Sequence, residues 1–133
     1  MRGCMMVTMI GAITVGAAQA ETVLNAAQLD GLLTGNTVYI AVPPGGPGGE
    51  NGGMAPFRYG SDGAASAALP NGTTLVGTWS INGDSYCVDW ENGPKGSCSR
   101  LVKDGSAIRI VDASTGDPRG AIDHIRPGNP EDL

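Results

Sequence analysis

The stretch 73–103, TTLVGTWSINGDSYCVDWENGPKGSCSRLVK, is the most informative part of this chain about its fold. It contains both tryptophans and two of the three cysteines, in three apolar runs separated by Asn-Gly and Gly-Pro turn signals. An Asn-Gly pair between two alternating runs is typical of a β-hairpin. The stretch therefore predicts consecutive antiparallel strands joined by short connections.

Similar turn signals recur every 10 to 12 residues through the second half of the chain, which is the spacing of an antiparallel meander. They are Asn71-Gly72, Asn82-Gly83, Asn92-Gly93, Asp104-Gly105 and Thr115-Gly116. The intervening segments predict strands over residues 73–81, 85–91, 97–103, 107–112 and 120–126.

Large apolar residues alternate with polar ones in the first two of these strands, so each strand has one buried and one solvated face. The apolar faces carry Leu75, Gly77, Trp79 and Ile81 in one strand and Tyr86, Val88 and Trp90 in the next. Gly77 predicts a bulge or a bend. Strands of this kind bury one face best by closing. We expect a mainly β fold, a small antiparallel β-barrel or curled meander with one short N-terminal helix.

The helix is expected within residues 22–33, where Asn25 can cap it and Leu29, Leu32 and Leu33 fall on one face. Its expected role is to cover one end of the sheet.

Four further segments lie between this helix and the meander. The β-branched segment 36–42 predicts the first strand, and the Pro/Gly-rich segment 43–53 predicts a loop. Residues 56–60 form a weak strand, and residues 64–69 fit either a strand or a loop.

The two downstream cysteines predict a disulfide. Cys87 and Cys98 are equidistant from Asn92-Gly93, so a hairpin turning there places them opposite each other. Pro94 has no N–H to close a two-residue turn, which predicts a longer loop over residues 92–96. The bridge closes a loop of twelve residues, worth roughly 3 kcal/mol in the chain-entropy estimate.

The N-terminus predicts a secretory signal peptide over residues 1–20, followed by a single domain over residues 21–133. It has one basic residue, an apolar core over 5–18 that is too short to span a bilayer, and Ala-Gln-Ala before the expected cleavage point. We expect a bacterial protein that is periplasmic or secreted, a location that favours the disulfide. Cys4 leaves with the signal.

The charge balance narrows the class of partner. Without Arg2, seven basic residues face thirteen acidic ones, a net charge of about −6. Nucleic acids and anionic membranes attract clustered Lys and Arg, so we expect neither as a partner and no stable membrane insertion.

Trp79, Tyr86, Trp90 and Arg100 are the candidate ligand-binding residues. Aromatic side chains inside a small barrel can form the floor of a pocket, and they can equally form its core. Arg100 and Arg109 alternate with apolar residues along their strands. If either side chain points inward, it is a buried cation that requires an anionic ligand or a carboxylate partner. If it points outward, it is an ordinary surface charge.

Catalysis is not expected, nor is a cofactor or a metal. A bridged cysteine pair leaves no free thiol, and no GxSxG segment accompanies His124, the only histidine. His124 is expected to face outward beside Arg126 while Ile125 points inward. One histidine without a CxxC pair makes a poor metal site.

Several short motifs, taken in order, resemble a family of short exported bacterial proteins of unknown function. They are 33–38 (LTGNTV), 77–79 (GTW), Cys87, Trp90, Cys98 and 127–130 (PGNP). The resemblance implies a small lipocalin-like β-barrel with an N-terminal helix, and it implies no activity.

Gly77-Thr78-Trp79 with one disulfide is also similar to bacterial inhibitors of secreted metalloproteases, although a helix is expected here in place of their mobile N-terminal trunk. From the fold analogy and the aromatic content we expect a non-catalytic binding module for a small ligand or envelope component. The alternative is a protein-interaction module such as an inhibitor of a secreted hydrolase.

Overall fold

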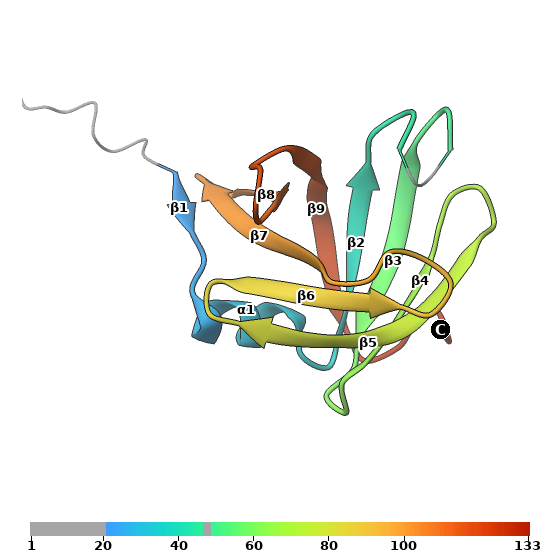
Figure 1. The fold of residues 1–133 in the computed structure, drawn as a ribbon, viewed down its shortest axis with the longest axis horizontal. Coiled ribbons are helices and arrows are strands. Elements are labelled where there is room, and N and C mark those ends of the chain that lie inside the picture. Colours follow the sequence, from blue (N-terminus) through green and yellow to red (C-terminus); the bar gives the residue numbers. More distant parts are fainter. Residues whose placement is uncertain (1–20, 47–48) are drawn as a thin grey trace, which may run out of the picture.

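Eight strands close into an antiparallel β-barrel in the computed structural model, which describes residues 21–46 and 49–133. They are β2 (Asn36–Val42), β3 (Gly53–Tyr59), β4 (Ala64–Ala68), β5 (Thr74–Asn82), β6 (Ser85–Trp90), β7 (Ser97–Asp104), β8 (Ala107–Asp112) and β9 (Pro118–Pro127). Consecutive strands pair from β2 to β9, and the β2–β9 pairing closes the sheet (Figure 1). The mainly β fold with one short helix is confirmed. The predicted signal peptide lies outside the described residues and stays a prediction.

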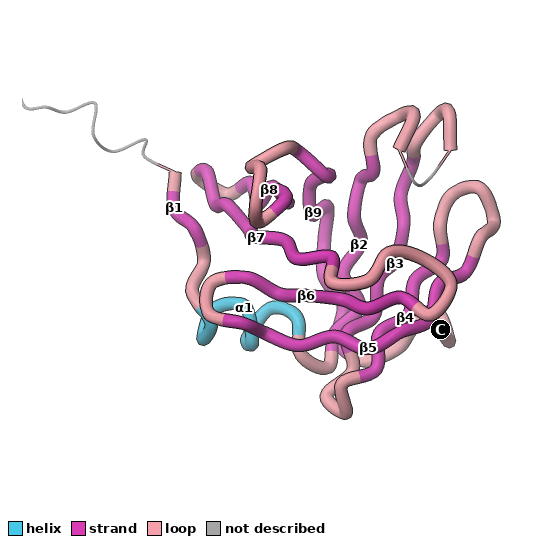
Figure 2. Tube along the Cα trace, in the orientation of Figure 1, coloured by secondary structure: helices cyan, strands magenta, loops and turns pink. Residues whose placement is uncertain are grey.

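The helix α1 (Ala26–Leu33) is the only helix in the described part of the chain (Figure 2). Asn25 caps it as predicted: its side chain accepts from the Gln28 backbone N–H at 2.9 Å, and the Gln28 side chain accepts from the Asn25 N–H at 2.9 Å. This reciprocal pair fixes the first turn. Thr22 and Val23 are a correction to the predicted helical stretch. They form the strand β1 (Thr22–Val23), because these β-branched residues favour extended backbone and pair with Lys103 and Val102 of β7.

Helix α1 is held by packing. Leu29 and Leu33 are 0% and 1% exposed and join the core with Val38 of β2 and Leu101 of β7. Leu24, just before the helix, is also in the core, and its N–H donates to the Leu101 carbonyl at 2.9 Å. An eight-residue helix is marginal in water, so this apolar contact stabilises it.

The barrel has two different ends. The loops β2–β3, β4–β5, β6–β7 and β8–β9 lie at one end, which we call the loop end, because the strands alternate in direction. Helix α1 lies at the lower left of Figure 1, away from these loops, which lie towards the top and right. The helix was expected to cover one end of the sheet, and it lies at the end opposite the loops. The interior can therefore be reached through the loop end.

The predicted strands match the observed ones within about three residues at either end. Residues 64–69, which fitted strand or loop, contain β4, and the described part of the 43–53 segment is a loop up to Gly53, the first residue of β3. Of the two alternatives predicted at Gly77, the bulge is not present. Neither neighbouring strand shifts register there, and the residue instead allows a close backbone approach, because a Cβ would lie 2.1 Å from the Asp89 carbonyl oxygen.

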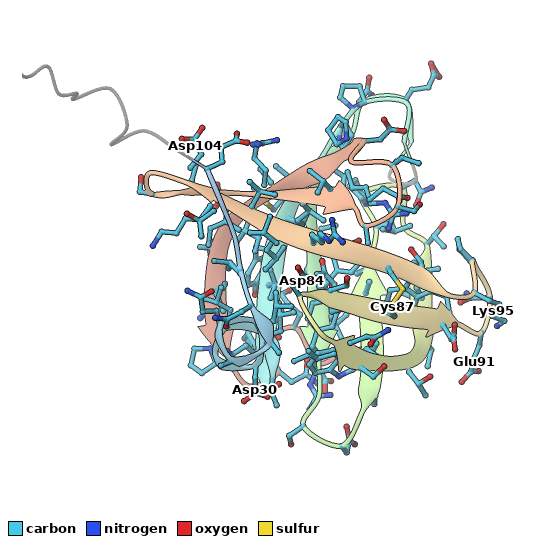
Figure 3. All side chains as sticks on the ribbon, turned by 60° about the vertical axis from the view of Figure 1, so that its left-hand side comes forward. Asp30, Asp84, Cys87, Glu91, Lys95 and Asp104 are labelled. Atoms are coloured by element: carbon cyan, nitrogen blue, oxygen red, sulfur yellow. A yellow bond between two sulfur atoms is a disulfide. The ribbon has the colours of Figure 1, made fainter. Side chains whose placement is uncertain are left out.

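The β6–β7 hairpin carries the predicted disulfide. Cys87 pairs directly with Cys98, their Cα atoms are 4.0 Å apart, and the sulfurs are bonded (Figure 3). The connection spans residues 91–96, and the carbonyl of Pro94 accepts from the Trp90 N–H at 3.0 Å. The longer loop that Pro94 predicts is confirmed.

Strand β9 contains two bulges. Its pairing with β2 shifts between Tyr39 and Ile40, leaving Asp123 as the extra residue. Its pairing with β8 shifts between Ile110 and Val111, leaving Arg119 as the extra residue. A bulge re-aims the side chain of the extra residue, which becomes important for Arg119.

Candidate functional site

A cavity of about 380 Å³ lies inside the barrel and extends to its loop end. Pro43, Leu69, Pro94 and Pro118, each in or beside a different one of the four loops, line it. Its volume lies in the range of small-molecule sites, which are usually apolar with a few polar groups. The barrel interior is therefore not completely filled by its own side chains.

Aromatic side chains form much of the cavity wall. Phe57 and Tyr59 point inward from β3, and Tyr86 and Trp90 point inward from β6, since side chains two apart share a face of a strand. Phe57 meets Trp90 edge to face at 6.2 Å between ring centroids, and Tyr59 meets Tyr86 at 5.6 Å. These edge-to-face contacts fix the rings in place.

The two tyrosines bring hydroxyl groups into this apolar interior. Burial raises the pKa of Tyr59 well above its ordinary value of 10.0, and the charge and hydrogen bonding of Tyr86 raise it further. Burial also raises the pKa of Tyr86, while hydrogen bonds with Tyr59 and Ser99 and the charge of Arg119 oppose the rise. Both hydroxyls are therefore neutral at physiological pH.

Arg119 supplies the positive charge at the cavity wall. Its Nη1 donates to Ser97 Oγ at 3.0 Å, to Ser99 Oγ at 2.9 Å and to the Cys98 carbonyl at 3.3 Å. Its Nη2 donates to Asp112 Oδ2. The bulge aims this side chain back at β7, and Gly120 permits the bulge, since a Cβ there would lie 2.7 Å from the Ala41 carbonyl oxygen.

Asp112 holds Arg119 from the side away from the cavity. Hydrogen bonds from the Ser114 hydroxyl and backbone N–H, and then from the Thr115 N–H, lower the pKa of Asp112 well below its usual range, and Arg119 lowers it further. Asp112 lines a second depression, outside the barrel, that also includes Arg119, Ser97 and Arg100. The guanidinium thus lies at the seam between the interior and the outer surface.

The four predicted ligand-binding residues separate into two groups. Tyr86 and Trp90 line the cavity. Trp79 does not; it packs edge to face on Tyr59 at 5.2 Å, and its Nε1 donates to the Gly60 carbonyl at 2.9 Å. Arg100 lies on the outer face of β7, with Nε 3.7 Å from Asp84 Oδ1, while its neighbours Ser99 and Leu101 are buried.

Arg119 is the charged cavity residue that the sequence analysis did not single out, and the lining residues Phe57, Tyr59, Ser97 and Ser99 were not singled out either. Side-chain alternation along β9 predicts which face of the strand an arginine lies on, and a bulge interrupts that alternation. The position of Arg119 therefore could not be predicted from alternation alone. The signal available in the sequence was Gly120, because a glycine inside a strand indicates a bulge or a close backbone approach.

The remaining candidates lie on the outer surface. Arg109 pairs with Glu21. His124 stacks on Tyr39, with ring centroids 4.1 Å apart, and its Nδ1 is 2.7 Å from Asp123 Oδ2. No cluster of three or more metal-binding side chains occurs among residues 21–46 and 49–133, and no helix in these ranges has the length and apolarity to cross a membrane.

A scan against protein-family models, a search of curated proteins and a search of solved structures each find no match to this chain.

Proposed function

We propose that this protein is a non-catalytic binding module that takes a small apolar molecule, or an apolar part of an envelope component, into the barrel. The observation that carries the proposal is the 380 Å³ cavity with Phe57, Tyr59, Tyr86 and Trp90 in its wall. A filled interior would have favoured a protein partner instead. Burying apolar ligand surface in such a cavity yields about 25 cal/mol per Å² before the costs of association.

The location and ancestry form part of the same proposal. We propose that the protein is exported to the periplasm or the exterior; the Cys87–Cys98 bridge supports this, because disulfides persist in oxidising compartments. We also propose a relation to the family of short exported bacterial proteins with a lipocalin-like barrel. Support comes from the ordered motifs and from the eight-stranded barrel with its one short helix.

A protein-interaction module, such as an inhibitor of a secreted hydrolase, is the weaker alternative. It would be favoured by a contiguous exposed apolar surface. The exposed large apolar residues of the described chain are Val23, Met54 and Val76, and they lie on β1, β3 and β5. These three residues are on three different strands, and they are weaker support for a protein partner than the cavity is for a small ligand.

The test is titration of the oxidised protein with 1-octanol, a neutral apolar probe, followed by calorimetry. In a Trp79→Phe variant, Trp90 is the sole tryptophan and reports on the cavity by fluorescence. We expect saturable binding and a shift in Trp90 emission. Val88→Phe places a larger side chain in the cavity wall and should weaken binding at least ten-fold, whereas Val76→Phe on the outer face should not.

Two results would contradict the proposal. One is the absence of any heat or emission change with 1-octanol. The other is equal affinity in the Val88→Phe and Val76→Phe variants, provided that both retain the native circular dichroism spectrum.

A further inference from the structure

The cavity wall has one polar corner, formed by Arg119, Ser97 and Ser99 close to the loop end. Among the lining residues that the structure describes, Arg119 is the only charged one, and no acidic side chain is present. The rest of the wall is apolar or aromatic, apart from the hydroxyls of Tyr59 and Tyr86. The corner therefore gives the interior a local positive polarity.

The hydrogen bonds of this corner run in one direction. A guanidinium only donates, so Ser97 Oγ and Ser99 Oγ are acceptors in their 3.0 Å and 2.9 Å contacts with Arg119 Nη1. Each hydroxyl keeps its own hydrogen to donate. The corner consequently offers O–H groups to whatever lies beside it.

Asp112 does not cancel this preference on the cavity side. Its Oδ1 accepts from the Ser114 N–H at 2.8 Å, the Ser114 hydroxyl at 2.7 Å and the Thr115 N–H at 3.1 Å, and its Oδ2 accepts from Arg119. Asp112 lines the outer depression and not the cavity. Its contacts orient the guanidinium, and both of its oxygens already have donors.

We propose that the ligand of the barrel is an apolar molecule that ends in a carboxylate, whose oxygens accept from Ser97, Ser99 and the Arg119 edge of the cavity. This inference rests on the proposed function and names the chemical class of its ligand. A carboxylate oxygen can accept from the serine hydroxyls and from the guanidinium edge, whereas a neutral hydroxyl would pair with the serines without gaining an ion pair. A single charge suits the site, because Arg119 is its only cation. Hydrogen bonds between ionised partners are about twice as strong as neutral ones.

The experiment compares octanoate with 1-octanol at neutral pH, since the two probes share a chain and differ in the head group. We expect octanoate to bind the oxidised protein at least ten-fold more tightly. Arg119→Gln should remove that preference, so that the variant binds the two probes with affinities within about two-fold of each other. Arg100→Gln is the matched control, because it removes the same charge from the outer face of β7 and should retain the preference.

Arg119 also joins β7, β8 and β9, so its substitution can disturb the fold. Ser97→Ala is therefore a second variant; it removes one donor and should reduce the preference for octanoate over 1-octanol several-fold. The inference is overturned if both probes bind alike, or if the folded Arg119→Gln or Ser97→Ala protein keeps the full octanoate preference. In that event 1-octanol binding still supports the proposed function. If 1-octanol does not bind, the proposed function itself fails.

Discussion

At the scale of the residue, Gly77 shows how one missing side chain permits a strand pairing. It lies opposite Trp90, where the β5 and β6 backbones come so close that a Cβ would be 2.1 Å from the Asp89 carbonyl oxygen and 2.9 Å from the Trp90 Cα. Both of these are backbone atoms, so no rotamer change can relieve the clash. The close approach helps to hold Trp90 at the cavity wall.

Substituting Gly77→Ala is expected to lower the free energy of unfolding by about 3 kcal/mol, the upper range for overpacking. Urea denaturation of the oxidised protein measures it. Gly31→Ala is the matched control: nothing lies within 4 Å of its Cβ position, and in a helix it should stabilise by about 0.5–1 kcal/mol. A loss at position 77 no larger than the experimental error would contradict the steric explanation.

At the scale of the element, the β6–β7 hairpin is the best-specified part of the chain. Its register follows from the positions of Cys87 and Cys98 and from the missing N–H of Pro94, all within twelve residues. The pairing β6–β7 covers only three residue pairs, from Tyr86–Ser99 to Val88–Ser97, and further along β7 the residues Val102 and Lys103 pair with β1. The covalent bridge reinforces this short ladder.

Replacing both cysteines, Cys87→Ser and Cys98→Ser, is therefore expected to lower the free energy of unfolding by about 3 kcal/mol, from the entropy that the unfolded chain regains. Urea denaturation with mass spectrometry under non-reducing conditions measures the stability and verifies the bridge. Two free thiols in the protein isolated under non-reducing conditions, or equal stability of the double variant, would contradict this prediction.

At the scale of the whole molecule, closure of the barrel affects the pKa values of two tyrosines in its interior. Tyr59 and Tyr86 come from strands that are not neighbours, and closure brings their rings to 5.6 Å in a buried site. The pKa of each tyrosine is raised above 10.0 in the folded protein. The folded state then keeps phenol protons that the unfolded chain releases.

The resulting stability is fully present below about pH 10, the pKa of the unfolded residue, and is lost as the pH rises towards the folded pKa. We expect the free energy of unfolding to fall above that pH by about 1.4 kcal/mol per pH unit for each of these two tyrosines. Denaturation at several alkaline pH values measures the slope, and Tyr86→Phe should reduce it. Tyrosinate absorbance from both residues while the near-ultraviolet circular dichroism stays native would contradict the prediction.

The candidate site was only partly predictable from the sequence. Tyr86 and Trp90 were identifiable because alternation within one strand is local and assigns both to the inner face. Arg100 and Arg119 were not distinguishable in this way, because the bulge at Arg119 depends on how β9 fits against both β8 and β2. Trp79 shares the inner face of β5, yet it packs on Tyr59 and Gly60 beyond the cavity.

Residues close together in the chain were sufficient to predict the mainly β class, the helix cap at Asn25, the strands between the recurring turns and the cysteine register. The closure of β9 onto β2, the remaining cavity and the position of Arg119 beside it became apparent only in the folded molecule. These features depend on contacts between distant segments and on the space that the inward side chains leave unfilled. Residues 73–103 therefore specify a meander, and closure by β2 and β9 turns it into a barrel with an interior site.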